Sequence, residues 1–125
     1  MAAVDLELRK QFQELQAQLL ETRAKMRQID AQMEVLRRNC QRSKLTQIEV
    51  KNFATDVNAY ESIGRMFVKK PKSEIEAILE KSIEANNMRI TKLEETKVYL
   101  ENSLKERENS LREFIAQRQQ QANTE

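Results

Sequence analysis

The sequence predicts a mainly α-helical protein, built as a long antiparallel two-helix coiled coil with one β-hairpin at its centre. Apolar residues recur at alternating steps of three and four on both sides of the chain's middle, which is the spacing of a coiled-coil seam. The only glycine and the only proline of the 125 residues, Gly64 and Pro71, lie between these two arms. Residues that interrupt helices are therefore confined to one short central segment.

The first arm is predicted to be a helix over residues 5–43. Its seam consists of Leu8, Phe12, Leu15, Leu19, Thr22, Met26, Ile29, Met33, Leu36 and Cys40. Only Thr22 in this series is polar, and two seam positions per heptad make a narrow stripe rather than a broad core face. The helix is therefore expected to pair with one other helix.

The apolar pattern stops after Cys40, so we expect a kink or break before the hairpin. Thr46 and Glu49 have the spacing of a capping box, which marks the start of a helix. A separate short helix is therefore predicted over residues 46–55, with apolar residues that do not continue the seam.

The segment over residues 58–70 is predicted to be a β-hairpin, because β-branched and aromatic residues surround Gly64. Alternation along a strand places Met66 and Val68 on one face and Phe67 on the other, so both faces carry apolar groups. A lone two-stranded hairpin is marginal in water, and its edges are unpaired. We expect it to pair with strands of other subunits in an oligomeric β-barrel; the alternative is a simple turn between two helices.

The second arm follows Pro71, and Ser73 with Glu76 again has capping-box spacing, so a helix with Ser73 as its N-cap is predicted over residues 73–118. Its seam consists of Leu79, Ile83, Asn86, Ile90, Leu93, Lys97, Leu100, Leu104, Arg107, Leu111 and Phe114. Three of these are polar, which weakens a seam but fixes its register and partner. The polar tail over residues 119–125 is expected to fray.

The charges on the two arms indicate that they pair with each other. The pairs of the preferred register are Arg37 with Glu80, Arg23 with Glu94 and Arg9 with Glu108. Each exposed pair contributes only about 0.2–1 kcal/mol, so the charges select a register more than they stabilise it. The same register places Thr22 beside Lys97. The alternative register, slipped by one heptad, brings Phe12 against Phe114.

The free ends of the arms form a candidate binding surface. In the preferred register Leu8 pairs with Leu111, and apolar residues beyond that layer remain uncovered. The tip residues are Val4, Leu6, Leu8, Leu111, Phe114 and Ile115. Exposed apolar groups at a fraying end suit weak, unselective contacts with another chain. The alternative is that these are ordinary seam residues at frayed ends.

The composition argues against an enzyme and against several classes of partner. The chain has no histidine, and no nucleophile, metal-ligand or phosphate-loop pattern appears, so we expect no catalytic, cofactor or metal site. Its 22 basic and 20 acidic residues leave little field to attract nucleic acid or membrane. No signal peptide or transmembrane run is present, and the single cysteine, Cys40, fits a reducing compartment, so we expect the cytosol or the nucleus.

The central segment NAYESIGRMFVKK, between two coiled-coil arms, resembles the β-type subunits of prefoldin, as does the opening VDLELRKQFQELQ. The resemblance covers nearly the whole chain, as a single domain over residues 1–125. An α-type subunit would need two hairpins, and this chain has room for one.

The resemblance implies an ATP-independent holdase, a heterohexamer of α-type and β-type subunits. Such complexes capture unfolded proteins, notably actin and tubulin, and deliver them to the cytosolic group II chaperonin. The barrel role then falls on Tyr60, Ile63, Gly64, Met66, Phe67 and Val68. The capture role falls on apolar residues at the arm ends. A structural coiled-coil adaptor without client binding remains the alternative function.

Overall fold

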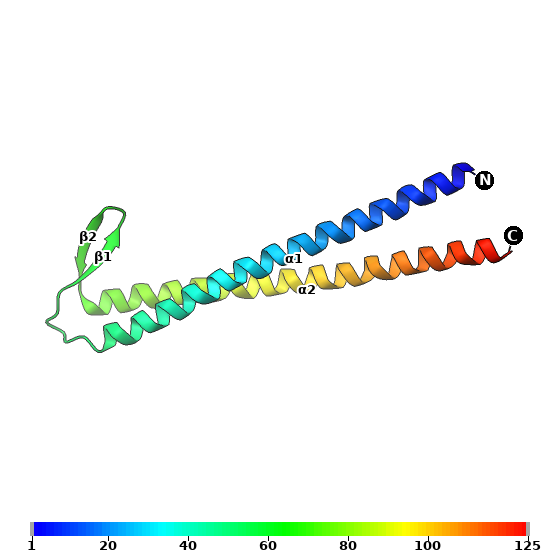
Figure 1. Cartoon of the computed structure of the whole chain (residues 1–125). Coiled ribbons are helices and arrows are strands. Elements are labelled where there is room, and N and C mark those ends of the chain that lie inside the picture. Colours follow the sequence, from blue (N-terminus) through cyan, green and yellow to red (C-terminus); the bar gives the residue numbers. More distant parts are fainter. Residues whose placement is uncertain (1, 125) are drawn as a thin grey trace. The chain divides into compact units, whose positions relative to one another are not determined.

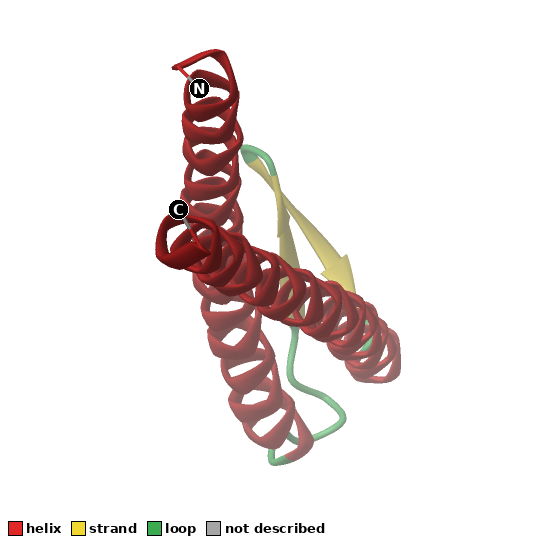
Figure 2. Cartoon of the chain, turned by 90° about the vertical axis from the view of Figure 1, so that its right-hand side faces the viewer, coloured by secondary structure: helices red, strands yellow, loops and turns green. Residues whose placement is uncertain are grey.

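Two long helices flank one β-hairpin, as the sequence predicted (Figure 1). The computed structural model describes the backbone of residues 2–124 and the side chains of residues 6–124. Its elements are α1 (Ala2–Lys51), β1 (Ala59–Ile63), β2 (Met66–Lys70) and α2 (Lys72–Thr124). Loops join both helices to the hairpin (Figure 2). Contacts divide the chain into two compact units, the arm unit (residues 1–31 and 94–125) and the hairpin unit (residues 32–93).

The predicted break after Cys40 is wrong, because α1 continues without interruption to Lys51. The hydroxyl of Thr46 donates to the Arg42 carbonyl at 2.9 Å, so Thr46 lies inside the helix and does not cap a new one. The seam also continues. Ser43 and Gln47 are half-buried at the next two seam positions, and Val50, one step further, is buried. Because the seam residues of this stretch are polar, apolar spacing alone could not show that the seam continues.

The bounds of α2 also differ from the prediction at both ends. The Pro71 carbonyl accepts hydrogen bonds from the Glu74 and Ile75 amides at 3.0 and 3.2 Å, so the first turn closes on Pro71 and not on Ser73. At the other end the tail that was expected to fray is helical as far as Thr124. The helix therefore includes nearly all of the polar glutamine-rich end.

The predicted seams are the least exposed lines along both helices. All ten predicted seam positions of α1 are buried or half-buried, and the same holds for the eleven of α2. The buried apolar residues in the described part of the chain are Leu19, Met33, Cys40, Val50 and Ile83. The polar Thr22 is only 3% exposed. Burial is thus concentrated in a narrow line, as expected for two helices that pair without a broader core.

In each unit the two helices run antiparallel. In the arm unit, Arg107 donates to Thr22 at 2.5 Å, and Lys97 pairs with Asp30 at 2.8 Å. In the hairpin unit, Cys40 contacts Asn87 and Gln47 donates to Glu80 at 2.6 Å. Positions on α2 fall in number as those on α1 rise, which confirms that the arms pair within the chain.

The preferred register is wrong, and the alternative, slipped by one heptad, is the one observed. Arg23 pairs with Glu108 at 3.2 Å and not with Glu94. Thr22 lies beside Arg107 rather than Lys97. Phe12 and Phe114 line the same hollow, as the alternative register requires. Arg23 therefore still pairs with an acidic residue, but this residue is Glu108 and not the predicted Glu94.

The two helices also contact each other beside the hairpin. The Lys72 ammonium donates to the carbonyls of Lys51 and Phe53, both at 2.9 Å, so α2 begins level with the end of α1. The preferred register had been selected by the charges of the two arms alone. Because α1 continues to Lys51, the start of α2 lies level with that residue, further along α1 than the predicted helix end at residue 43.

We expect Lys72→Met to destabilise the helix pair by about 1 kcal/mol. The last carbonyls of a helix lack intrahelical partners, and a cationic donor both satisfies them and opposes the helix dipole. Methionine keeps the aliphatic stem and removes the charge and the donors. The urea midpoint of the helical signal measures the loss. Lys81→Met, at an exposed position of the same helix, is the control; equal midpoints for the two variants would contradict the role of Lys72.

Candidate assembly hairpin and arm-tip surface

Gly64 makes the sharp turn of the hairpin possible. The strands pair antiparallel from Ala59 with Lys70 to Ile63 with Met66, leaving Gly64 and Arg65 as a two-residue loop. Gly64 has φ +60°, and no other described residue has a positive φ. A positive φ at the first loop position alone is a type II′ turn, whose twist matches that of the strands. Any L side chain at Gly64 would be strained although the space around it is open.

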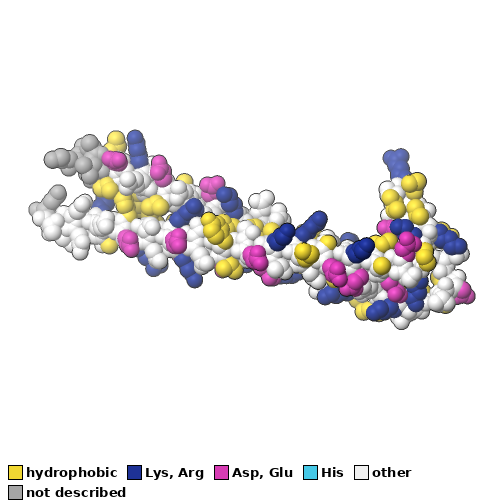
Figure 3. Space-filling model, turned by 180° about the vertical axis from the view of Figure 1, so that it is seen from behind, with side chains coloured by type: hydrophobic (Ala, Val, Ile, Leu, Met, Phe, Trp, Pro, Cys, Tyr) yellow, Lys and Arg dark blue, Asp and Glu magenta, His cyan; other side chains and the backbone are white. Residues whose placement is uncertain are grey.

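The strand register confirms the expected division of side chains between two faces. Ile63, Met66 and Val68 lie on one face, and Tyr60 and Phe67 on the other. The aromatic residues are largely uncovered, Tyr60 by 57% and Phe67 by 74%. Hydrophobic side chains are visible over the hairpin surface in Figure 3. All six residues predicted for assembly therefore meet in one small element.

An ion pair that sequence reasoning missed closes the open end of the hairpin. Lys70 Nζ lies 2.5 Å from Glu61 Oε2, on the face that carries Val68. The hydrogen bond to the Glu61 carboxylate raises the pKa of Lys70 above its usual value. Opposite charges at nearby positions of one face around a predicted turn were the available signal. The pair holds the two strand ends together beside the helix junction.

The aromatic face of the hairpin borders an apolar hollow within the hairpin unit. Tyr60 and Phe67 line it from the strands, and Val50, Phe53 and Ile75 line it from the segments next to the helix ends. Phe53 is itself exposed. Sequence reasoning set Phe53 aside as a residue outside the seam, whereas here it extends the apolar surface of the hairpin.

The arm-tip residues are only partly brought together. Phe114 and Ile115 line a hollow with Phe12, and Ile115 is 40% exposed. Leu6 is exposed, and Leu8 is half-buried. These two residues do not line the hollow.

The other two residues predicted for the arm tip are Leu111 and Val4. Leu111 is half-buried and does not line the hollow of Phe12 and Phe114. The Val4 side chain lies outside the described residues. Sequence reasoning missed Phe12 as a tip residue, although the alternative register had placed it against Phe114.

Among residues 2–124, no three His, Cys, Asp or Glu side chains are grouped so that they could hold a metal ion. Over the same residues, neither helix has a stretch of the length and apolarity that crossing a bilayer requires. Cys40 is buried, and its thiol lies 3.6 Å from Asn87 Oδ1. What remains prominent is the exposed hairpin.

A family model described as prefoldin subunit matches residues 13–118, which include both seams and the hairpin. The chain belongs to the prefoldin subunit family. Human prefoldin subunit 1 is 39% identical over 120 residues, which cover 96% of this chain and 98% of the human one. Prefoldin subunit 1 of Arabidopsis thaliana is 35% identical over 106 residues, covering 85% and 83%. The predicted resemblance to β-type prefoldin subunits is confirmed.

A solved structure carries the same fold. The prefoldin beta subunit from Thermococcus strain KS-1 matches with a TM-score of 0.75 at 23% identity, covering 82% of this chain and 90% of that one. Prefoldin subunits are chaperone components that assemble with other prefoldin subunits. The paired arms and single hairpin of this chain are therefore features of a prefoldin subunit.

Proposed function

We propose that this chain is a subunit of a hexameric, ATP-independent holdase that assembles through its hairpin and captures unfolded proteins at its arm tips. The observation that carries the proposal is a hairpin with apolar side chains on both faces and no further strand beside it among the described residues. Its partners in the ring are other prefoldin α-type and β-type subunits. Its compartment is the cytosol, with the nucleus as a further location.

The hairpin has a strong physical reason to assemble. Phe67 and Met66 are mostly exposed, and burying one such side chain contributes about 1.5–3 kcal/mol. Each strand also has one edge whose amides and carbonyls are not paired with another strand. Strands from neighbouring subunits would satisfy both needs and make the shared β-barrel.

The arm tips supply weak apolar contacts for capture. The hollow lined by Phe12, Phe114 and Ile115 is small, so one arm holds a client weakly. Several arms acting on one unfolded chain raise the overall affinity by avidity. Nascent actin and tubulin are the clients that we propose, with delivery to the cytosolic group II chaperonin. Nothing in this activity requires a nucleotide or metal.

The coiled-coil adaptor is the weaker alternative. An adaptor needs a seam that is free to pair with another protein. Here the seam of α1 is covered by the chain's own α2, as the contacts of Thr22 with Arg107 and of Gln47 with Glu80 indicate. The exposed apolar surface lies instead on the hairpin, which an adaptor would not need.

We expect Phe67→Asp with Val68→Asp to prevent assembly while the helices stay paired. Two carboxylates on opposite hairpin faces cannot be buried unpaired in a shared barrel. Native mass spectrometry of the chain coexpressed with the other subunits measures the loss of the hexamer, and circular dichroism checks the helices. Val98→Asp with Tyr99→Asp, an exposed apolar pair on α2, is the matched control. A hexamer that survives the hairpin change would refute assembly through the hairpin.

Changing Phe114 and Ile115 to serine should weaken client protection by several-fold while the hexamer persists, because the hollow loses most of its apolar surface. Light scattering of a denatured client diluted into the assembled complex measures the protection. The control replaces Val98 and Tyr99 by serine, which removes a similar exposed surface elsewhere on α2. Equal protection by the two complexes would rule out capture at the tip.

A further inference from the structure

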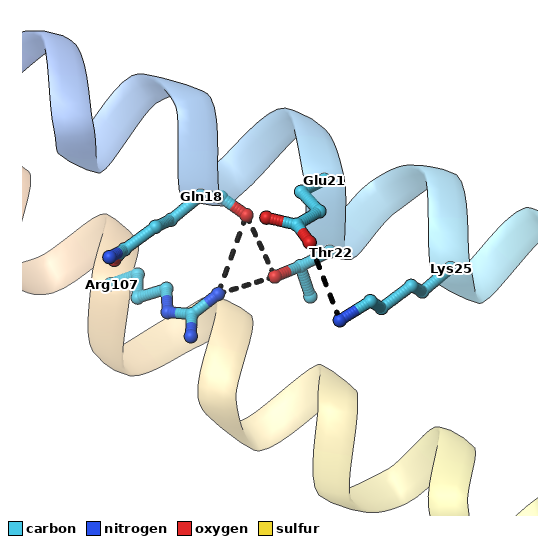
Figure 4. A network of polar contacts seen from close by, with 5 residues as sticks. All are labelled: Gln18, Glu21, Thr22, Lys25 and Arg107. Carbon is cyan, nitrogen blue, oxygen red and sulfur yellow. Dashed lines mark hydrogen bonds and ion pairs between the residues drawn. The ribbon is translucent and has the colours of Figure 1, made fainter.

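The most buried described side chain of this protein is polar. Thr22 is 3% exposed, and its hydroxyl donates to the Gln18 carbonyl at 2.8 Å. Across the seam, Arg107 Nη1 donates to the Thr22 hydroxyl at 2.5 Å and to the same carbonyl at 3.4 Å. Figure 4 shows the guanidinium reaching from α2 to both acceptors on α1. We call these three residues the Thr22–Arg107 layer.

Arg107 occupies a seam position that an apolar residue would normally fill. Leu104 and Leu111, its seam neighbours on α2, are half-buried as Arg107 is. An apolar side chain holds a closed seam because separation exposes it to water, whereas a guanidinium is well hydrated when exposed. When the helices separate here, Thr22 and Arg107 exchange their mutual hydrogen bond for bonds to water, which offset part of the loss.

The ion pairs beside the layer and on its hairpin side are also contacts that water can replace. Arg23 pairs with Glu108 at 3.2 Å, and both side chains are substantially exposed. Lys97 pairs with Asp30 at 2.8 Å, again near the surface. Exposed ion pairs contribute little to stability and are screened by salt. These ion pairs therefore oppose separation of the helices in the arm unit only weakly.

We propose that the Thr22–Arg107 layer is a built-in opening point, from which the arms separate outward. Opening uncovers Phe12, Phe114 and the half-buried leucines between them and the layer, so it enlarges the apolar surface of a closed tip. The use of that surface for capture rests on the proposed holdase function, whereas the opening itself does not. The polar layer thus sets how much of each arm becomes available to an unfolded partner.

Amide hydrogen exchange of the full-length chain tests the opening point directly. Thr22→Val with Arg107→Met keeps both side-chain volumes close to the originals and makes the layer apolar. We expect exchange to slow by about tenfold at the amides of residues 6–17 and 108–124, since exchange of paired helices reports the free energy of opening. Residues 59–70 of the hairpin should not change. The control is Arg112→Met, at an exposed position of α2.

Three results would overturn the opening point. Faster exchange in the two arm segments would make the layer a clasp that holds the arms together. Unchanged exchange would mean that the layer does not control opening. Equal slowing in the arms and in the hairpin would indicate a uniform gain in stability instead. The single variant Arg107→Met is measured in parallel, because it retains Thr22 with its bond to Gln18 should the double variant fold poorly.

Client protection by the same variant separates this inference from the proposed function. Slower arm exchange with weaker protection supports the opening point and its use in capture. Slower exchange with full protection also supports the opening point, but places capture on surfaces that are exposed in the closed arms. The change of Phe114 and Ile115 to serine tests the tip independently of either result.

Discussion

The Lys72 ammonium lies against carbonyls at and just after the end of α1, and this contact holds the start of α2 beside that end. It donates to Lys51 and Phe53 and therefore brings the first turn of α2 level with the last turn of α1. The register seen in the hairpin unit, at Gln47 with Glu80, is the one seen in the arm unit, at Thr22 with Arg107.

That register sorts the side chains into surfaces with different uses. It covers the seam of each helix with the other, so the seam is not available to a further coiled-coil partner. It leaves the apolar residues of the hairpin exposed, with Phe67 the most uncovered among the large hydrophobic side chains. It also brings Phe12 and Phe114 to one hollow in the arm unit. As we propose them, assembly uses the surface of the hairpin and capture uses the arm tips. Both surfaces stay exposed when the helices pair.

Sequence patterns predicted the features that depend on local chemistry. The seam positions follow from apolar spacing, and the hairpin follows from Gly64 among β-branched and aromatic residues. The continuity of α1 did not follow, because Ser43 and Gln47 are polar seam residues and Thr46 mimics a helix cap. The predicted register of the two helices was wrong as well. Weak surface charges such as those of Arg23 fit more than one register, and only the true end of α1 distinguishes them.

The hollow beside the hairpin and the Thr22–Arg107 layer could not be predicted for a related reason. Phe53 and Tyr60 become neighbours only when the loop after Lys51 has its actual length and path. Arg107 was recognised as a polar interruption of the seam, but its partner depends on register. Features within one helix or hairpin could therefore be predicted from the sequence, whereas contacts between these elements could not.

Disulfide formation from Cys40 tests the register of the two helices directly. Cys40 is the only cysteine, and its sulfur lies 3.6 Å from Asn87 Oδ1. Mild oxidation of the Asn87→Cys chain should therefore form an internal disulfide rapidly. Glu80→Cys and Glu94→Cys report slips of one heptad in either direction and should form it at least several-fold more slowly. Preferential bonding to position 80 would indicate the register predicted from the charges and contradict the pairing seen in the structure.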